Sequence, residues 1–414
     1  MFLPSNESLD GLVQFNGDHT VIEVNPSFSF GQRLHSFADL TIQTIASEPA
    51  LRLLESDWNK LSERVVPRNV FATFGWYSAW SRFYSEVESE GRFHPELLVF
   101  RQNGELAGIA PLVRRVSTKF GLRIRRLEFV SVHSDYNQLV VGDDQGKLTS
   151  ALFGFLAQTS ENWDVIDLRD LSDDDDGAKL IEQALLEHAL PYRTISEDHP
   201  CPYMSLEGGA ESQNALLSGR TRRVLRNRKT RADREGARIR LIEHPELEAG
   251  LLETIINLER KKHLRSKFPT FIGPHQRVFR DLIDQLGPRH WLCVALLELG
   301  SEAIAYQLTF RCGGRLWDYS KACDRAHAHL APGTLLLQAM FDYGFTNGYS
   351  EYDFLRGLEA YKQVWSSKYR TRSRLLIWNK AVVSNLRKII YYDLKPAIYR
   401  ATRKEGEEGR AIQP

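Results

Sequence analysis

The feature of this sequence that most constrains its fold is an approximate internal repeat. Residues 95–115 read as a strand, a polar turn and a second strand, with an Asn-Gly turn at residues 103–104. Residues 290–311 follow the same order, with a Gly-Ser turn at residues 300–301. In both segments the second strand begins with a glutamate that is followed by small apolar residues. The pattern predicts one β-hairpin in each half of the chain.

The repeat continues downstream of each hairpin. Residues 146–163 have the pattern of a helix that leads into an apolar strand at 164–168, and residues 333–348 lead in the same way into a strand at 350–355. Hairpin, further strand, helix and strand, made twice, predict an α/β fold of two halves, each a mixed central sheet flanked by helices. Because this order of elements is common, a chance likeness between two generic α/β stretches is the alternative.

Composition limits the classes of protein to which the chain can belong. The 414 residues suffice for two or three domains, and 42% hydrophobic and 26% charged residues are ordinary for a globular protein. A formal net charge of +1 gives no reason for the whole protein to bind DNA or an anionic membrane. The four cysteines are widely spread, which argues against a disulfide framework or a zinc site and suits a reducing compartment.

The sequence also lacks the signals of membrane insertion and export. No apolar run approaches the roughly 20 residues that span a bilayer, and the N-terminus has no basic segment followed by an apolar stretch. We therefore expect a soluble, cytoplasmic protein without a transmembrane segment.

Two stretches resemble the tandem acyltransferases of the CelD-like and FemAB-like families, which belong to the GNAT superfamily. LSGRTRRVLRNRKTRADREGARIRLIE (217–243) resembles the basic helix that opens their second domain, and YDFLRGLEAYKQVWSSKYRTRSRLLIW (352–378) resembles their C-terminal signature. The likeness spans about residues 50–380. It implies two tandem GNAT folds and transfer of an acyl group to an amine, from acyl-CoA or, in the Fem branch, from aminoacyl-tRNA.

With this resemblance the chain divides into four expected segments. They are a partly disordered N-terminal arm (1–35), a first GNAT-like half (36–195), a second GNAT-like half that carries the active site (196–380), and a basic amphipathic C-terminal helix and tail (381–414) that docks on the second half or touches a membrane surface.

The turn that precedes the helix of the second half is the candidate site for the coenzyme. A helix N-terminus offers unpaired amides and a partial positive charge to a diphosphate. Arg325, Gly333 and Thr334 are the candidate cofactor-binding residues there, although the turn has one glycine where GNAT proteins usually have two spaced glycines. An ordinary loop with a capped helix is the alternative. The two histidines of this turn have no suitable neighbouring ligand, so we expect no metal.

Polar residues after the last strand of the repeat are the candidates for catalysis. Aminolysis of a thioester needs a proton acceptor for the amine and a donor for the thiolate. Asp353 and Glu359 are the candidate acceptors, Tyr361 is the candidate donor, and Arg356 and Lys362 are candidates for holding an anionic part of a substrate. A structural Asp–Arg pair beneath a turn is the alternative.

A strongly basic segment is the third candidate site. Residues 220–240 hold ten basic and two acidic residues, and Arg222, Arg226 and Lys229 share one face of the predicted helix. A phosphate-bearing substrate would neutralise this charge. The alternative is a solvated helix paired with the four aspartates at 173–176.

The first half offers weaker candidates. Residues 133–137 (His-Ser-Asp-Tyr-Asn) form a polar segment that either lines the cleft between the halves or is a simple turn. Two aspartates stand ahead of the helix at 146, where they would repel a diphosphate.

Together with the resemblance, these observations favour an N-acyltransferase that uses acetyl-CoA or another acyl-CoA as co-substrate. The resemblance implies that the acyl group is acetyl, and that the acceptor amine is a small molecule or a sugar, cell-envelope or exopolysaccharide precursor. The alternatives are a Fem-like transferase that depends on aminoacyl-tRNA, for which tRNA would be a partner, and a non-catalytic accessory protein of polysaccharide biosynthesis.

Overall fold

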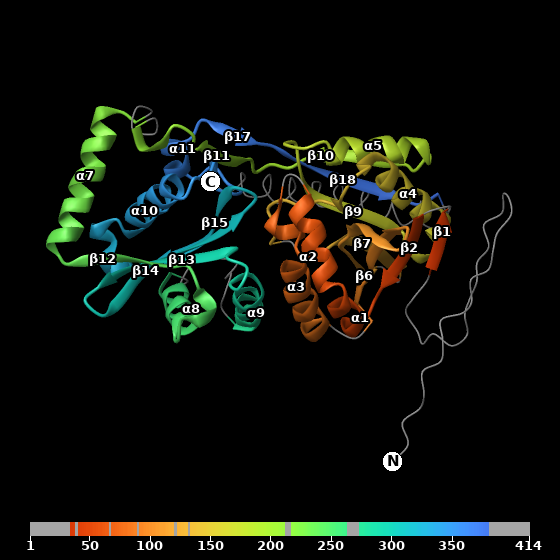
Figure 1. Ribbon diagram of the computed structural model, residues 1–414, viewed down its shortest axis with the longest axis horizontal. Helices are drawn as coiled ribbons and strands as arrows, with labels where there is room; N and C mark the ends of the chain where they lie inside the picture. The colour runs from red at the N-terminus through yellow and green to blue at the C-terminus, as the bar shows by residue number, and fades with distance from the viewer. Residues whose placement is uncertain are drawn as a thin grey trace, which may run out of the picture.

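The computed structural model describes residues 34–37, 40–65, 68–88, 91–119, 122–130, 133–211, 217–262 and 273–380. The strands form three sheets, which lie in two lobes that are joined along one side (Figure 1). Within these ranges, no helix has both the length and the apolar character needed to cross a bilayer. Most of the predicted N-terminal arm and all of the predicted C-terminal tail lie outside the described residues.

The first lobe contains two sheets, in the orders β1-β2-β4-β5-β8 and β10-β18-β9-β7-β6-β3. Two bent strands pass from one sheet into the other, since single residues separate β3 from β4 and β5 from β6. The elements up to the end of β10 are β1 (Leu34–Phe37), β2 (Leu40–Ile45), α1 (Glu48–Leu53), α2 (Glu55–Arg64), α3 (Phe74–Val87), β3 (Phe93–Pro95), β4 (Leu97–Gln102), β5 (Glu105–Ala110), β6 (Leu112–Lys119), β7 (Leu122–Phe129), β8 (Val140–Val141), α4 (Gln145–Gln158), β9 (Val165–Ser172), α5 (Gly177–Glu187) and β10 (Tyr192–Ser196).

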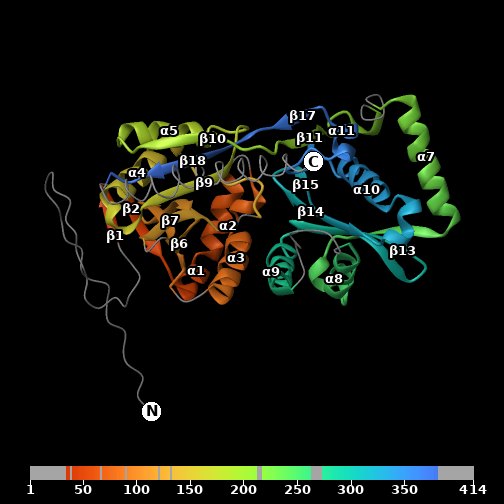
Figure 2. The same cartoon turned by 180° about the vertical axis from the view of Figure 1, so that it is seen from behind.

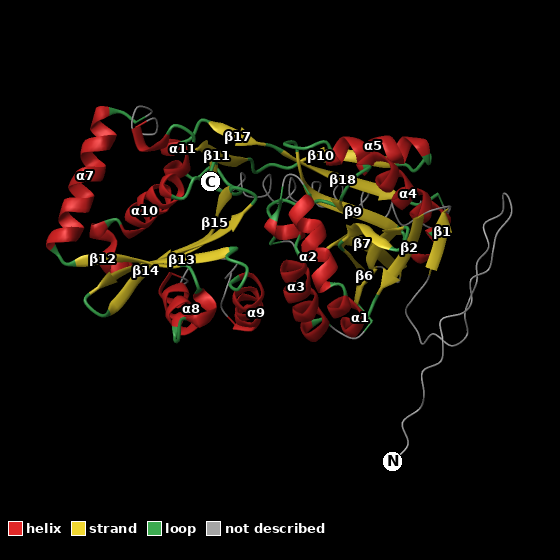
Figure 3. Cartoon of the chain, in the orientation of Figure 1, coloured by secondary structure: helices red, strands yellow, loops and turns green. Residues whose placement is uncertain are grey.

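The second lobe contains one sheet, in the order β12-β13-β14-β15-β16-β11-β17. Helices cover both of its faces, with α8 and α9 below it and α10 and α11 above it in the view of Figure 3. The remaining elements are β11 (Cys201–Ser205), α7 (Gly219–Arg234), β12 (Ala237–Ile242), α8 (Leu251–Lys262), α9 (Gln276–Leu286), β13 (Leu292–Leu299), β14 (Glu302–Cys312), β15 (Arg315–Cys323), the 3-10 helix η5 (Arg325–Leu330), α10 (Pro332–Thr346), β16 (Glu351–Asp353), α11 (Ala360–Trp365), β17 (Lys368–Arg370) and β18 (Arg372–Trp378).

One strand crosses between the lobes. β18 is the last described strand of the chain, yet it lies between β9 and β10 in the first lobe. β11, near the start of the second half, lies between β16 and β17 in the second lobe. β10 and β11 run antiparallel to β18 and β17, so one two-stranded ribbon passes through both lobes (Figures 1 and 2). The two halves of the sequence are therefore not independent folding units.

The predicted internal repeat is confirmed. Both hairpins form, β4 with β5 and β13 with β14, and both predicted helix–strand units follow them as α4–β9 and α10–β16. Asn103 and Gly104 have φ values of 51° and 84°, the left-handed conformation that a two-residue hairpin turn of type I′ requires. The fold is thus α/β, with a mixed sheet and flanking helices made twice.

β15 carries the irregularity that shapes the second lobe. Thr309 pairs with Asp318 and Leu308 pairs with Ser320, so Tyr319 is an extra residue on β15 without a partner in register. Beyond this bulge β15 continues to Cys323, whereas the parallel pairing with β16 involves only its first three residues. The two strands therefore diverge toward the carboxyl end of β15.

Aromatic residues of the first lobe form much of the contact between the lobes. α3 carries several aromatic side chains into the core, where Trp76, Tyr77 and Trp80 are each at most 1% exposed. Trp76 packs against Phe310 of the second lobe, and α3 packs on α9. One hydrophobic core is consequently shared by both lobes.

The acidic run at 173–176 also belongs to this joint. Asp174 pairs with Arg315 at 2.9 Å, and Asp173 accepts a hydrogen bond of 3.0 Å from the amide of Thr371. The alternative in which the run pairs with the basic helix at 220–240 is therefore wrong. The run lies in the crossover region and is paired there.

Because β18 lies between β9 and β10, a destabilising substitution in β18 should also destabilise these two strands of the first lobe. Ile377 is fully buried in the core of the first lobe, so Ile377→Ala should lower the free energy of unfolding by about 2–5 kcal/mol. Hydrogen exchange should report faster exchange in β9 and β10, although β18 is distant from them in sequence. Leu186→Ala, at a position that is 68% exposed on α5, is the control. Unchanged protection of β9 and β10 would contradict the role of β18.

Candidate active site

Asp353 lies at the end of β16, within a buried network that joins the lobes. Its Oδ2 accepts hydrogen bonds from the Tyr136 hydroxyl at 2.9 Å and from Arg370 at 3.0 Å, and its side chain has no exposed surface. Burial raises the pKa of Asp353 to about 7, while the charge of Arg370 opposes this rise. The first-lobe segment 133–137 is thus a buried contact between lobes and not a solvent-exposed turn.

Arg356 and Lys362 hold the turn that follows β16. Arg356 binds the carboxylate of Asp135 and the carbonyl oxygen of Ser134, both in the first lobe. Lys362 is 3% exposed and donates hydrogen bonds to the carbonyl oxygens of Leu355 at 3.2 Å and Arg356 at 2.6 Å. Both cations are therefore occupied by the protein, whereas the sequence suggested that they bind substrate.

Tyr361 and Glu359 are the two predicted catalytic residues with exposed side chains. Tyr361 is 38% exposed, and the Glu359 side chain is 56% exposed in its ion pair with Lys362. The ammonium of Lys321, on β15, lies 4.4 Å from the centre of the Tyr361 ring, and Lys321 pairs with Asp318 at 2.5 Å. Burial and the charges of Asp318 and Glu359 raise the pKa of Tyr361, so the phenol keeps its proton.

The candidate coenzyme turn lies where β15 ends. α10 begins after Ala331, whose φ of 53° is left-handed, and no side chain caps the helix. A Cβ added to Gly333 would meet no atom within 4 Å, so the space in front of the turn is open. Arg325 is exposed on η5. The amides of Thr334 and Leu335 bond the carbonyl oxygen of Ala331, so Gly333 is the residue of the first turn whose amide faces the open approach. This amide, the helix dipole and the neighbouring arginines fit a diphosphate.

The basic helix and the candidate coenzyme turn, which the sequence suggested separately, lie against each other. From α7, Arg228 donates a hydrogen bond of 3.0 Å to the Thr334 hydroxyl, and Arg231 donates one of 3.2 Å to the carbonyl oxygen of His329. Of the α7 side chains, only Leu225 and Ala232 are buried. Arg222, Arg226 and Lys229 are all exposed, and α7 lies along one end of the molecule (Figure 1).

The turn and the tyrosine occupy the same edge of the sheet. Lys321, which contacts Tyr361, precedes Asp324 at the start of the turn by three residues, about 10 Å along an extended chain. A ligand that extends from the turn along the end of β15 would therefore reach Tyr361. Among the described residues, no group of three or more His, Cys, Asp or Glu side chains is placed to hold a metal ion.

A charged cleft lies at the boundary between the lobes. It has an empty volume of about 1010 Å³ and includes Arg356, which follows β16. Burial raises the pKa of Asp170, in this cleft, to about 6. Its ionisable lining residues are Arg115, Arg126, Arg169 and Arg356 with Glu128, Asp167, Asp170 and Glu197, together with Tyr84.

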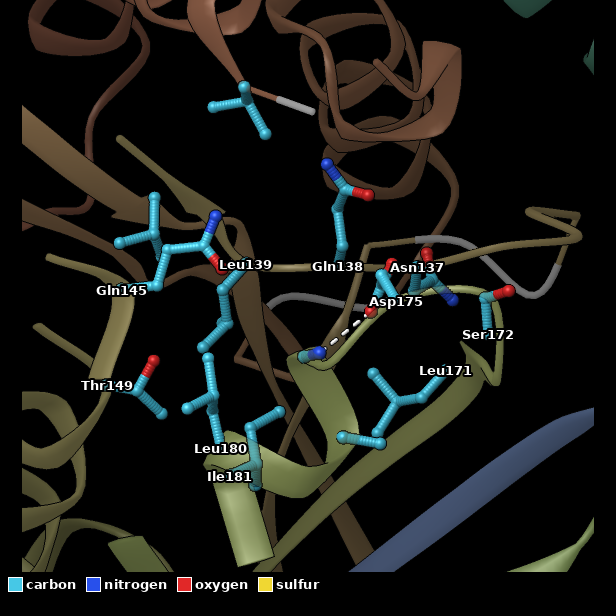
Figure 4. A pocket seen from close by; sticks show the side chains of 14 residues that line it. Asn137, Gln138, Leu139, Gln145, Thr149, Leu171, Ser172, Asp175, Leu180 and Ile181 are labelled. Carbon is cyan, nitrogen blue, oxygen red and sulfur yellow. Dashed lines mark hydrogen bonds between the residues drawn. The ribbon is translucent and has the colours of Figure 1, made fainter. Parts of the chain in front are cut away.

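The first lobe has a smaller pocket at the position that corresponds to the coenzyme turn. Its empty space of about 520 Å³, part of which is open solvent, lies between β8 and β9, beside the N-termini of α4 and α5 (Figure 4). Leu139, Leu171 and Ile181 give it an apolar lining. Asp175 caps the amide of Gly177, at the start of α5, at 2.8 Å, so a carboxylate stands where an anion would have to bind.

Comparisons with known proteins agree with this geometry. Residues 219–363 match the acetyltransferase (GNAT) domain family. This match covers about a third of the chain and lies within the second lobe. The fold of the chain is similar to that of FemX, at 13% identity and a TM-score of 0.55, over 79% of this chain and 96% of FemX. It is also similar to a conserved protein of unknown function from Bacteroides thetaiotaomicron, at 10% identity and a TM-score of 0.51, over 81% of this chain and all of that one.

The search of curated protein sequences found no match to this chain. The likeness to FemX and to the Bacteroides protein concerns the fold alone, because the identities are low. The matched family domain, in contrast, contains α7, the coenzyme turn and Tyr361, so it coincides with the candidate site of the second lobe.

Sequence reasoning missed the polar residues on the strands beneath Tyr361. Gln307 and Thr309 on β14, and Asp318 on β15, are at most 6% exposed. The available signal was the presence of polar side chains at alternating positions in otherwise apolar strands. A strand pattern predicts that Gln307 and Thr309 share a face, but it does not show which residues of another strand lie opposite them.

The raised pKa of Asp353 predicts a pH dependence of stability. The folded chain holds a proton on this carboxyl between about pH 4 and pH 7, where the unfolded chain releases it, so this contribution to stability is lost as the pH rises through about 7. Asp353→Asn cannot titrate, so its free energy of unfolding should fall less than that of the wild type between pH 5 and pH 8 in urea titrations. Arg370 keeps Glu351 as a partner in the variant. An equal decrease in the free energy of unfolding of the variant and the wild type would contradict the raised pKa of Asp353.

Proposed function

We propose that this protein is an N-acyltransferase of the GNAT type that moves an acyl group, acetyl in the simplest case, from acyl-CoA to an amine. The observation that carries the proposal is the contact of α7 with the coenzyme turn, which directly follows β15, the strand whose Lys321 contacts Tyr361. An anion site and a proton donor thus share one edge of the sheet. The match of residues 219–363 to the GNAT family supports the same conclusion.

The coenzyme turn would hold the diphosphate. The open start of α10 offers the amide of Gly333, because Pro332 has no N–H and the Thr334 amide bonds the carbonyl oxygen of Ala331 at 2.9 Å. Arg228 supplies positive charge beside it. Arg226 and Lys229 extend the basic surface of α7 away from the turn, where further phosphate groups would lie.

The reaction at the thioester requires two proton transfers. The amine attacks the thioester carbon, a C–N bond forms, and the C–S bond breaks. Glu359 is exposed as a carboxylate and is the proposed acceptor of the proton that the amine loses. Tyr361, whose raised pKa keeps it protonated, is the proposed donor to the departing thiolate. Asp353, wholly buried, would position the turn that bears both residues.

The charged cleft between the lobes is the proposed acceptor site. Four arginines and four carboxylates line it, so it suits a polar acceptor with groups of both signs and not an apolar chain. A sugar or cell-envelope precursor that bears an amine has this character. That choice rests on the resemblance to the CelD-like families.

A second candidate function is aminoacyl transfer from charged tRNA, as in the Fem branch. The observation that favours it is the exposure of the α7 cations at one end of the molecule, because RNA phosphates would neutralise them equally well. Saturable binding of aminoacyl-tRNA without binding of CoA would support this function. Binding of neither would support an accessory protein without catalytic activity.

Calorimetric titration with CoA tests the anion site. The double variant R226E/K229E replaces two exposed cations of α7 by carboxylates, so its affinity for CoA should fall by about tenfold or more. The matched control is Arg193→Glu, a charge reversal at an exposed position on β10 in the first lobe. Equal affinities of the double variant and the wild type would remove α7 from the site.

Replacement of Tyr361 tests the chemistry. Tyr361→Phe removes the hydroxyl but keeps the ring on Lys321, so CoA should bind with unchanged affinity. The rate of acyl transfer should fall about 100-fold, the usual contribution of a positioned acid. Thiol release with an amine acceptor is the measurement, and Tyr369→Phe, at a 59% exposed position on β17, is the control. Unchanged turnover would exclude Tyr361 as the acid.

A further inference from the structure

Among the buried acceptor atoms of the described residues that have no hydrogen-bond partner, three lie on the adjacent strands β14 and β15. They are Oε1 of Gln307, Oγ1 of Thr309 and Oδ1 of Asp318, on side chains that are 0%, 0% and 6% exposed. A buried polar group left unpaired costs roughly 1–3 kcal/mol. Single cases occur in most proteins, but three together in one place require an explanation.

The three atoms belong to one face of the sheet. Thr309 and Asp318 are direct partners in the pairing of β14 with β15, and Gln307 precedes Thr309 by two residues, so strand alternation places it on the same side. Gln307 donates a hydrogen bond of 2.6 Å to the Tyr352 hydroxyl. That bond uses its amide nitrogen and leaves the amide oxygen as the unpaired atom. We name Gln307, Thr309 and Asp318 the acceptor cluster.

The acceptor cluster adjoins the proposed reaction centre. Asp318 pairs through its other oxygen with Lys321, whose ammonium lies against the ring of Tyr361. The Lys321 side chain is 25% exposed and Tyr361 is 38% exposed, so the cluster meets solvent at these two residues. If Tyr361 protonates the leaving thiolate, its hydroxyl faces the thioester sulfur, and the acyl carbonyl carbon is bonded to that sulfur. The rest of the acyl group would then lie beside the cluster.

The charge of the cluster indicates which kind of donor suits it. The carboxylate of Asp318 is already neutralised by Lys321 at 2.5 Å, so the site as a whole is neutral. A second ammonium would be repelled by Lys321, whereas a hydroxyl donates a hydrogen bond without adding charge. A plain alkyl chain would leave all three acceptors unpaired.

We propose that the acceptor cluster recognises the transferred group, and that this group is a hydroxyacyl group whose hydroxyl donates to Gln307, Thr309 or Asp318. The inference rests on the proposed function, because it places the acyl group at Tyr361. It narrows the acyl donor from acyl-CoA in general to a hydroxyacyl thioester.

The experiment compares three ligands on the full chain by calorimetry: CoA, butyryl-CoA and 3-hydroxybutyryl-CoA. The two thioesters differ by one hydroxyl. We expect 3-hydroxybutyryl-CoA to bind about 10- to 100-fold more tightly than butyryl-CoA, because one unpaired acceptor is then satisfied. Binding of CoA with equal affinities for the two thioesters would overturn this inference alone. Absence of binding by all three ligands would overturn the proposed function as well.

Variants locate the effect in the cluster. Thr309→Val removes an unpaired oxygen at nearly constant volume, and Gln307→Leu removes the amide. Each variant should therefore lower the ratio of the affinity for 3-hydroxybutyryl-CoA to the affinity for butyryl-CoA. Thr149→Val, at a 3% exposed position on α4 in the first lobe, makes the same change in an equally buried place and should leave the preference intact. Unchanged preference in both cluster variants would contradict the proposal. Tighter binding of 3-aminobutyryl-CoA would contradict the choice of a neutral donor.

Discussion

The ribbon that β10 and β11 make with β18 and β17 is the constraint on which the rest of the structure depends. β18 comes from the second half of the sequence but lies between β9 and β10, so that sheet of the first lobe is not complete without the second half. β11 and β17 continue the ribbon into the sheet of the second lobe. The backbone hydrogen bonds of the ribbon cannot be made locally, and their formation fixes the relative position of the lobes. The shared hydrophobic core and the packing of α3 on α9 then follow from that position.

The same joint explains why several polar residues after β16 are buried. Once the lobes are fixed, Asp353 meets Tyr136 and Arg370, and Arg356 meets Asp135. Such pairs contribute little net stability relative to apolar residues, but loss of one partner leaves the other charge buried and uncompensated. The network therefore determines a unique arrangement of the turn, and the turn carries Tyr361 toward Lys321. The paired charged residues Asp353 and Arg356 therefore position the turn, whereas the exposed residues Glu359 and Tyr361 are available for catalysis.

Much of the fold was predictable because its signals are local. An Asn-Gly pair between alternating strands, or a Pro-Gly pair at a helix start, acts within a few residues and appears in the sequence as such. The insertion of β18 into a sheet of the first lobe has no local signal, since the strand would have the same apolar pattern in either lobe. The candidate site divides in the same way. Tyr361 was found from its place after a strand, whereas Asp318 became visible only when the register with Thr309 was known.

The two lobes share one framework but differ in the charge of the side chains at their helix N-termini, which are basic beside α10 and acidic beside α4 and α5. In the second lobe, the start of α10 has no side-chain cap and adjoins the arginines of α7. In the first lobe, Asp143 and Asp144 precede α4, and Asp175 caps the amide of Gly177 at the start of α5. A diphosphate is attracted to the first arrangement and repelled by the second, although the helix dipoles are alike. The charge of neighbouring side chains therefore separates the two lobes, so that one is suited to a coenzyme and the other supplies the wall of the acceptor cleft.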